Sequence, residues 1–506
     1  MTPQVRNTSE LWHFFRNQAA RFAPRSAVST LSAELTFAGM FDRAEELALK
    51  LASAGVREGD LVAMALPNSI AFVPAFLSLL RLSAKVALVS PKYREKELQG
   101  IHASVRPRCF LTTGSFARLV QEALTVETAL HVAVPGLVED MQILFPAAPT
   151  VPSPQTEAET SAQKAAALIK FTSGSTGIPK GIALTVDNIL AEAQNVVTTL
   201  GLSPEDRVLA PVPMFHSYGF DLGVLPMLFS GAHLSMRDSF IPRSTLSELS
   251  RPDVTVFLGV PSMYHIFTEI LLPAAPDLGH VRYLLSCTAP LPPHLIAAFY
   301  RQFHMPICQH YGSSETGAVT NHVPSAVLER MGSVGRPLNN VSVRIVDENG
   351  LVLPAGEEGE VLVTSQVVAP GYIMGEAPGE SKFNRDSYRT GDLGLLDDEG
   401  FLFLRGRKDD LINVGGLKVS PYEVIQALES HPAVREAAVA GVKDALGEEV
   451  VYAAVTLKAP ASEQEILAFC RTRLSDYKIP RRLDIRDEMP RGPSGKIKLD
   501  PGEIRL

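Results

Sequence analysis

The segment between residues 171 and 181 constrains this chain more than any other. It reads Phe171-Thr-Ser-Gly-Ser-Thr-Gly-Ile-Pro-Lys-Gly181 and lies between an apolar strand pattern and a helix pattern that begins at Val186. Glycines let the backbone approach an anion, while amides, hydroxyls and the charge of Lys180 bind phosphate oxygens. Its spacing differs from the Walker pattern, and a flexible linker rarely joins a strand to a helix. The sequence therefore predicts a phosphate-binding loop of another kind.

Alternating strands and helices dominate the first two thirds of the chain. From about residue 10 to residue 113, apolar runs such as 61–66 and 86–89 are separated by helix-length segments, which indicates an α/β subdomain with parallel strands. Residues 146–163, rich in Pro, Ala, Thr and Glu, predict an exposed connector and a break between subdomains. A second α/β region follows, with strand candidates at residues 208–211, 254–258, 283–286 and 307–310.

The pattern changes after residue 341. Short alternating runs continue to about residue 404 and are separated by turn signals such as Asn349-Gly350, which favours an antiparallel, barrel-like piece. A charged turn at residues 408–410 then opens a compact tail. We therefore predict an α/β fold. Its large N-terminal domain, residues 1–406, holds two α/β subdomains and the β-barrel-like subdomain, and residues 407–506 form a small α+β C-terminal domain.

Composition excludes several classes of partner. A net charge of -8 with both signs mixed along the chain offers no basic surface for nucleic acid. The most apolar stretch, residues 70–80, is too short to span a membrane and predicts a buried helix. The first ten residues lack a secretory signal pattern, so we expect a cytoplasmic protein without membrane insertion. Four scattered cysteines form no C-x-x-C pair, which argues against zinc, redox or disulfide sites.

The phosphate-binding loop resembles the signature of the adenylate-forming superfamily, which includes acyl-CoA synthetases, aryl-CoA ligases, amino-acid adenylation enzymes and firefly luciferase. The resemblance extends from about residue 10 to the C-terminus, and Ser314 stands where the family usually has threonine. Five further segments resemble superfamily motifs in the expected order: Tyr311-Gly-Ser-Ser-Glu-Thr-Gly317, Tyr388-Arg-Thr-Gly-Asp392, Gly406-Arg-Lys-Asp-Asp-Leu-Ile412, Gly415-Gly-Leu-Lys-Val419 and Pro490-Arg-Gly-Pro-Ser-Gly-Lys-Ile497.

This resemblance implies a two-step reaction. ATP activates a carboxylic acid as an acyl-adenylate with release of pyrophosphate, and the acyl group then passes to a thiol, either of coenzyme A (CoA) or of phosphopantetheine on a separate carrier protein. Lys496 would be the catalytic lysine, and Glu315 would hold Mg²⁺ together with hydroxyls of the phosphate loop. Asp409 would be the hinge between the domains.

The resemblance also implies which residues bind the nucleotide and the thiol. Tyr311 would stack on adenine, and Asp392 would bind the ribose hydroxyls with Arg407 nearby. The full ATP-binding set is Thr172, Ser173, Gly174, Ser175, Thr176, Gly177, Lys180, Thr288, Ala289, Pro290, His310, Tyr311, Gly312, Ser313, Ser314, Asp392 and Arg407. Residues of the thiol tunnel would be Gly415, Gly416 and Lys418.

Elementary electrostatics agrees with these roles. Attack of a carboxylate on the α-phosphate brings two anions together, so catalysis must come mainly from positioning and from cations aimed at the developing charge. Lys496 and a magnesium ion near Glu315 would supply them. A lysine carries a compact charge on a long stem, which suits a group that arrives with a mobile domain.

The acyl pocket is expected along residues 213–223 and 286–290. There His216 resembles a gate near the substrate carboxylate and is placed with the catalytic residues, although a core histidine is the alternative. Cys287 and Thr288 are bulkier than the small residues of many relatives, which disfavours long-chain acids. The predicted pocket residues are His216, Phe220, Asp221, Gly259, Ser286 and Cys287.

Asp221 leaves the kind of acid open. It could anchor a substrate ammonium, which would make the chain a stand-alone amino-acid or β-amino-acid adenylation enzyme that loads a carrier protein. It could instead cap a helix that starts at Leu222, in which case an aryl or medium-chain acid joined to CoA is the default. No residue favours a luciferase-like oxidation, and a non-catalytic relative should have lost Lys496, Glu315 or the loop.

Overall fold

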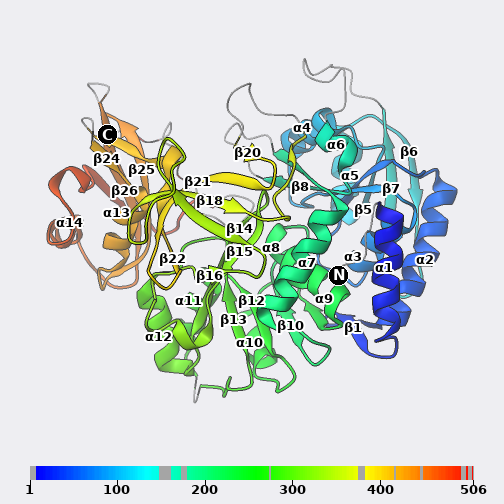
Figure 1. Ribbon diagram of the computed structural model, residues 1–506, viewed down its shortest axis with the longest axis horizontal. Coiled ribbons are helices and arrows are strands. Elements are labelled where there is room, and N and C mark those ends of the chain that lie inside the picture. The colour runs from blue at the N-terminus through cyan, green and yellow to red at the C-terminus, as the bar shows by residue number, and fades with distance from the viewer. Residues whose placement is uncertain are drawn as a thin grey trace.

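The computed structural model describes residues 7–138, 140–147, 161–172, 179–272, 275–373, 382–414, 417–444 and 448–491, together with residues 497, 499 and 504. Within these ranges two large sheets lie toward one end of the long axis and in the middle, and the C-terminal elements occupy the other end (Figure 1). A smaller antiparallel sheet lies between the large sheets and the C-terminal elements.

The first sheet has a parallel centre and antiparallel edges. Its order is β19 (Gly371–Tyr372), β9 (Lys180–Leu184), β8 (Leu168–Thr172), β4 (Lys85–Leu88), β3 (Leu61–Ala65), β5 (Cys109–Thr113), β7 (Met141–Pro146) and β6 (Val126–His131). Strand β8 is buried along residues 168–171 and therefore needs a neighbour on each side, which β4 and β9 provide. Because β8 and β9 follow residues 146–163 in the chain, the predicted subdomain break at that connector is wrong.

The second sheet contains the four strands predicted at residues 208–310. Its order is β16 (Arg336–Pro337), β15 (Gly317–Asn321), β14 (Ile307–Ser313), β13 (Tyr283–Ser286), β12 (Val256–Gly259), β10 (Arg207–Ala210), β11 (His233–Met236), β1 (Ser26–Ser29) and β2 (Glu34–Thr36). Strands β14 to β1 in this order are parallel, so the ends of β10, β12, β13 and β14 point to one edge. Ligands of such α/β sheets bind at that edge.

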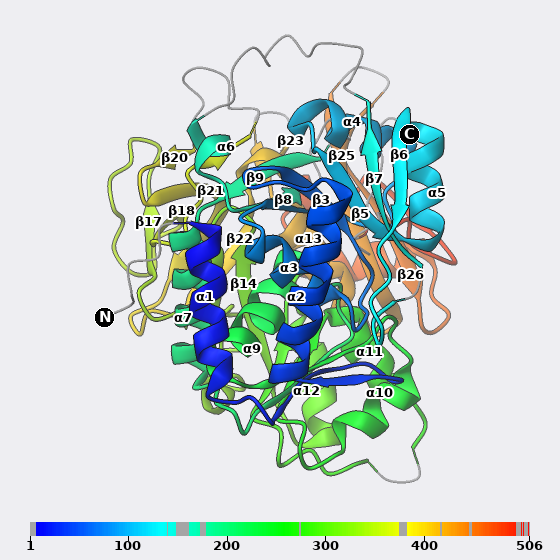
Figure 2. The ribbon, with the colours of Figure 1, turned by 90° about the vertical axis from the view of Figure 1, so that its right-hand side faces the viewer.

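Helices between and around the sheets join them through one apolar core. That cluster includes Val86 of the first sheet, Phe257 of the second and apolar residues of α1 and α2, two helices that lie side by side at the front of the view in Figure 2. The predicted helix at residues 70–80 is confirmed as α3, which is buried from Phe72 to Leu80. The helices are α1 (Thr8–Ala20), α2 (Phe37–Ala54), α3 (Phe72–Arg81), α4 (Glu95–Val105), α5 (Gly114–Ala123), α6 (Ser161–Ala165), α7 (Val186–Leu200), α9 (Leu225–Ser230), α10 (Pro242–Leu249), α11 (Pro261–Glu269) and α12 (Pro293–Phe303).

The third sheet confirms the antiparallel prediction for residues 341–404. It consists of β17 (Ser342–Val346), β18 (Gly359–Thr364), β21 (Ser387–Leu396), β20 (Phe383–Asn384) and β22 (Leu402–Arg407). A 3₁₀ turn, η3 (Lys408–Asp410), leads from β22 into the C-terminal region. That region contains β23 (Ile412–Val414), β24 (Leu417–Val419), α13 (Pro421–Glu429), β25 (Val434–Lys443), β26 (Glu449–Leu457), α14 (Glu463–Arg471) and β27 (Arg482–Ile485), with its own apolar core.

A search of the helices in the described ranges for a membrane-spanning segment found none of sufficient length and hydropathy.

Candidate active site

Strands β8 and β9 position the two ends of the predicted phosphate loop. Thr172 pairs with Lys180 across this antiparallel hairpin, so the two ends of the loop leave the sheet side by side. The Lys180 ammonium lies 5.6 Å from the centroid of the Tyr372 ring. Five residues predicted to bind ATP here, Ser173, Gly174, Ser175, Thr176 and Gly177, lie outside the described residues.

Glu315 lies beside the same tyrosine. The Tyr372 hydroxyl donates a hydrogen bond of 2.8 Å to Glu315 Oε1, and it lies 3.2 Å from the Tyr388 hydroxyl. Burial, followed by the charge of Glu315, raises the pKa of Tyr372, so this phenol stays a donor at neutral pH. Lys180, Tyr372 and Glu315 thus form one continuous cluster, which we call the Glu315 cluster.

Asp392 lies against Tyr311 and Arg407. It pairs with Arg407 across β21 and β22, and the guanidinium donates to Asp392 Oδ1 at 3.2 Å. The Tyr311 hydroxyl donates to Asp392 Oδ2 at 2.5 Å. Burial raises the pKa of Asp392, opposed by the Tyr311 hydrogen bond and the Arg407 charge. A carboxylate has about four acceptor positions, so ribose hydroxyls could still donate to it.

The Asp392–Tyr311–Arg407 group lies next to the Glu315 cluster. Tyr388, which touches Tyr372, lies on the same strand as Asp392, and the charge of Glu315 acts on the Asp392 carboxyl. The predicted hinge residue Asp409 is exposed in η3, where Lys382 Nζ donates to its carboxylate at 3.3 Å. A hinge candidate therefore lies close to the proposed ribose site.

The turn between β14 and β15 holds most of the remaining nucleotide candidates. Ser313 and Thr316 hydrogen-bond across it at 3.0 Å, and a Cβ at Gly312 would lie 2.3 Å from the Gly317 carbonyl oxygen. His310 is buried and its Nδ1 donates to Asn321 Oδ1 over 3.3 Å, and burial lowers the pKa of His310 to about 4. A hairpin with internal hydrogen bonds and a close backbone contact at Gly312 therefore carries this motif.

The acyl segment connects to that turn. His216 precedes the short helix α8 (Ser217–Gly219), and the Ser217 hydroxyl lies 2.7 Å from the Ser314 hydroxyl. Tyr218 stacks on His310 with ring centroids 6.2 Å apart. The acyl-pocket candidates on this segment therefore lie next to the nucleotide candidates.

Two strand ends carry the rest of the predicted acyl pocket. Gly259 and Ser286 are register partners in β12 and β13, and a Cβ at Gly259 would lie 2.7 Å from the Phe257 ring. Cys287 is half-buried and close enough to Tyr218 to affect its pKa. Thr288 has φ of 76°, a strained value for a β-branched residue, and the exposed Ala289 and Pro290 follow it. Such strain is common at functional sites.

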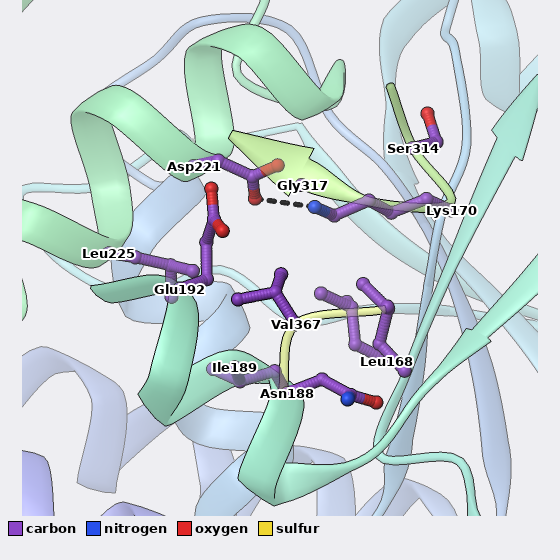
Figure 3. Close-up of a pocket in the computed structure, with 11 residues that line it drawn as sticks. Leu168, Lys170, Asn188, Ile189, Glu192, Asp221, Leu225, Ser314, Gly317 and Val367 are labelled. Atoms are coloured by element: carbon purple, nitrogen blue, oxygen red, sulfur yellow. Dashed lines mark hydrogen bonds and ion pairs between the residues drawn. The ribbon is translucent and has the colours of Figure 1, made fainter. Parts of the chain in front are cut away.

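Asp221 differs from both expectations. It does not cap a helix at Leu222, because it lies inside the π-helical turn η1 (Phe220–Val224) that continues α8. Its carboxylate forms an ion pair with Lys170 of β8 (Figure 3), and both side chains are 3% exposed. Phe220 packs edge-on against Phe76 in the core, with ring centroids 5.1 Å apart. Because the chain itself supplies a cation to Asp221, no substrate ammonium is needed there.

Lys170 and Asp221 line a small pocket, and a second carboxyl group, Glu192 of α7, lines the same pocket (Figure 3). Its Oε1 accepts the Ala318 amide at 3.0 Å, and its Oε2 has no hydrogen-bond partner. Burial, followed by the charge of Asp221, raises the pKa of Glu192 to about 8. We call Lys170, Glu192 and Asp221 the Lys170 cluster.

Three predicted residues of the C-terminal region, Gly415, Gly416 and Lys496, lie outside the described residues, whereas Lys418 is exposed on β24. Across the described ranges no group of three or more His, Cys, Asp or Glu side chains could hold a metal. Magnesium bound by one carboxylate and the phosphates of its nucleotide needs no such group, and Glu315 is a suitable single carboxylate.

Sequence reasoning missed Tyr372 and Lys170. Tyr372 reaches the site only because β19 pairs with β9, a contact between segments far apart in the chain. Lys170 had a local signal, since a lysine inside the apolar run 166–171 must find a partner when that strand is buried.

Comparison with protein-family models gives two matches. A family model described as "AMP-binding enzyme" matches residues 15–373, and one described as "AMP-binding enzyme C-terminal domain" matches residues 423–496. The 2-succinylbenzoate–CoA ligase of Bacillus licheniformis is 32% identical over 484 residues, which cover 95% of this chain and 97% of that protein.

Solved structures show the same architecture. The o-succinylbenzoate CoA synthetase of Bacillus subtilis in complex with its acyl-adenylate intermediate superposes with a TM-score of 0.79 at 28% identity, covering 96% of each chain. The same synthetase in complex with ATP and a magnesium ion also gives 0.79, at 29% identity, with 96% of this chain and 98% of that chain covered.

Proposed function

This chain belongs to the AMP-binding enzyme family, and from that premise we propose that it joins an amine-free carboxylic acid to CoA. It is an adenylate-forming ligase: ATP and magnesium activate the acid as an acyl-adenylate with release of pyrophosphate, and a thiol then accepts the acyl group. The residues that perform these steps and the class of acid are the substance of the proposal.

One observation carries the assignment of the nucleotide site. The Asp392–Tyr311–Arg407 group adjoins the Glu315 cluster, and the ends of the predicted phosphate loop leave the sheet beside that cluster. A ribose at Asp392 would then place the triphosphate toward Lys180 and Glu315. Fixed donors and charges arranged before the substrates bind are the main source of catalysis in such a transfer.

Charge neutralisation is the main chemical task at this site. Lys180 supplies a cation beside the ends of the loop. The hydrogen bond from Tyr372 holds the Glu315 carboxylate in the same cluster. Magnesium, when bound, neutralises charge on the phosphates. We further propose that residues 407–506 act as a mobile domain, in which Lys496 approaches the α-phosphate and Asp409 lies at the hinge.

The acid is held between the strand ends and His216. Cys287 and Thr288 occupy the end of β13 with side chains larger than glycine or alanine, which supports an aryl or medium-chain acid over a long chain. The Lys170–Asp221 ion pair argues against an ammonium subsite at Asp221. Free cysteines at all four positions support a reducing, cytoplasmic location.

Acid-dependent exchange of labelled pyrophosphate into ATP tests the proposal. With magnesium present, we expect exchange with aryl or medium-chain acids and at least tenfold less with α- or β-amino acids, because one unpaired buried charge costs more than the ~1.4 kcal/mol that corresponds to tenfold. Thioester formation with CoA completes the assay. A chain that exchanges pyrophosphate only with amino acids, or with no acid, contradicts the proposal.

A further inference from the structure

The Lys170 cluster connects three segments that carry site residues. Lys170 lies on β8, the strand that leads into the predicted phosphate loop. Asp221 lies on η1, which continues directly from the His216–Gly219 segment. Glu192 accepts the amide of Ala318, the residue that follows the Tyr311–Gly317 turn. Figure 3 shows these side chains converging on one pocket, with Ser314 at its edge.

Stability alone does not account for these charges. The side chains of Lys170 and Asp221 are 3% exposed, and Glu192 is 2% exposed. Removing two charges from water costs several kcal/mol per ion in proteins, and apolar residues of similar volume often replace a buried pair without loss of stability. Methionine in place of Lys170 and leucine in place of Asp221 would fill the same space, because the other walls of this pocket include Leu168, Ile189 and Leu225.

What an ion pair adds over apolar packing is a fixed relative position. An apolar contact tolerates sliding, whereas the ammonium and carboxylate have to stay within hydrogen-bonding distance. The Ser217–Ser314 hydrogen bond of 2.7 Å provides a second connection between the same segments. The ion pair holds the acyl segment against β8, and the serine hydrogen bond holds it against the Tyr311–Gly317 turn.

We propose that Lys170 is a positioning residue for adenylation: through Asp221 it fixes the His216 segment relative to the strand that carries the phosphate loop. This inference rests on the proposed function, because it concerns the approach of the substrate carboxylate to the α-phosphate. The thiol-transfer step starts from an acyl-adenylate whose two parts are already joined, so it depends less on this distance.

The test compares three proteins: the wild type, Lys170→Met/Asp221→Leu, and the control Arg237→Met/Glu248→Leu. The double substitution avoids an unpaired buried charge, and burial, the main cause that raises the pKa of Glu192, is kept in the variant. Arg237, which follows β11, and Glu248 of α10 form another buried ion pair, with side chains 9% and 11% exposed, and this pair joins segments other than the phosphate-loop strand and η1. Thermal unfolding, pyrophosphate exchange and thioester formation from supplied acyl-adenylate are measured for each.

We expect the Lys170/Asp221 variant to unfold near the wild-type temperature while kcat for adenylation falls by about 10- to 100-fold. Thioester formation from supplied acyl-adenylate and the KM for ATP should stay within about threefold, and the control variant should keep both half-reactions. Wild-type adenylation in the Lys170/Asp221 variant, or equal loss of both half-reactions, would overturn the positioning role. A wild-type chain without exchange activity would instead overturn the proposed function.

Discussion

Glu192 is a carboxyl group that folding removes from water without giving both of its oxygens a partner. The Ala318 amide satisfies Oε1, while the negative charge of Asp221 lies nearby. Burial and this charge raise its pKa from 4.5 to about 8, so the folded protein holds a proton there through the neutral range. The unfolded chain releases that proton near its ordinary pKa.

This difference predicts a pH-dependent effect of Glu192→Gln. Between pH 4.5 and about 8 the folded state binds more protons at Glu192 than the unfolded state, so its contribution to stability is lost as pH rises through this window. Glutamine keeps the volume and an acceptor but does not titrate. We expect the variant to gain unfolding free energy relative to the wild type as pH rises from 5 to 8, measured by urea unfolding. Parallel curves for the two proteins would contradict the raised pKa.

Lys496 gives a second prediction at this scale. Its proposed role is to neutralise charge during attack on the α-phosphate, so Lys496→Ala should lower adenylation by about 100-fold or more, in the range found when one preorganised charge donor is removed. Thioester formation from supplied acyl-adenylate should remain largely intact. Lys443→Ala, which removes an exposed lysine of β25, is the control. Equal loss of both half-reactions would contradict the assigned role.

Which residues the sequence could identify depended on whether their signal was local. Tyr311, Asp392 and Arg407 were assigned to the nucleotide because each lies in a recognisable motif; their side chains lie in contact, and their binding of a nucleotide stays a prediction. Asp221 was misjudged because its partner, Lys170, is supplied by a different strand. Tyr372 has no motif of its own and reaches Glu315 through a pairing between β19 and β9. Tertiary contacts of this kind leave no pattern in one sequence.

At the scale of elements, the α8–η1 segment owes its path to a close backbone contact. Gly219 lies against Pro213, where a Cβ would be 2.3 Å from the carbonyl oxygen and 2.9 Å from the carbonyl carbon. Gly223, on the next turn, faces flexible side-chain ends, with a Cβ 3.2 Å from Leu234 Cδ1 and 3.5 Å from Met214 Sδ. The two glycines are therefore matched probes of this segment.

Gly219→Ala should be destabilising and Gly223→Ala nearly neutral. Backbone atoms cannot move aside as a methyl group of leucine can, so we expect Gly219→Ala to cost about 1–3 kcal/mol and to lower adenylation, since His216 lies on the displaced turn. At Gly223 the helix-forming gain of ~1 kcal/mol offsets the small overlap. Urea unfolding and pyrophosphate exchange measure both effects. Equal stabilities for the two variants would contradict the close contact.

Strand positions were easier to predict than sheet membership. The strands expected at residues 283–286 and 61–66 appear as β13 and β3 with nearly the same bounds, because their apolar runs are local signals. The connector at residues 146–163 suggested that the chain leaves the first subdomain, yet β8 returns to pair with β4. The composition of a connector does not predict which sheet the next strand joins. That pairing depends on burial of both faces of β8, which the first sheet provides.

For the whole molecule, the proposed function requires the C-terminal region, residues 407–506, to change its position. Beyond η3 it contacts the second sheet's α11 through an ion pair of 3.6 Å between Arg435 and Glu269, with both side chains 43% exposed. An exposed ion pair contributes about 0–1 kcal/mol of stability, so breaking this one would add little to the free energy of a rotation. The proposed hinge at η3 would then control such a rotation.

Lys408→Pro tests that rotation with little local strain. Arg407 has φ of -114° and ψ of 143°, the extended conformation that a residue before proline adopts, and Lys408 is the first residue of a 3₁₀ turn, where the φ of proline fits. Proline should therefore preserve this arrangement while removing rotation about φ at the hinge. We expect one half-reaction to fall more than about tenfold relative to the other, because a single arrangement cannot serve both. Lys408→Ala also loses the 3.9 Å contact with Glu360 but keeps φ free, so it should leave the ratio of the half-reactions unchanged. If Lys408→Pro also keeps that ratio, the change between the half-reactions does not need rotation about φ of residue 408.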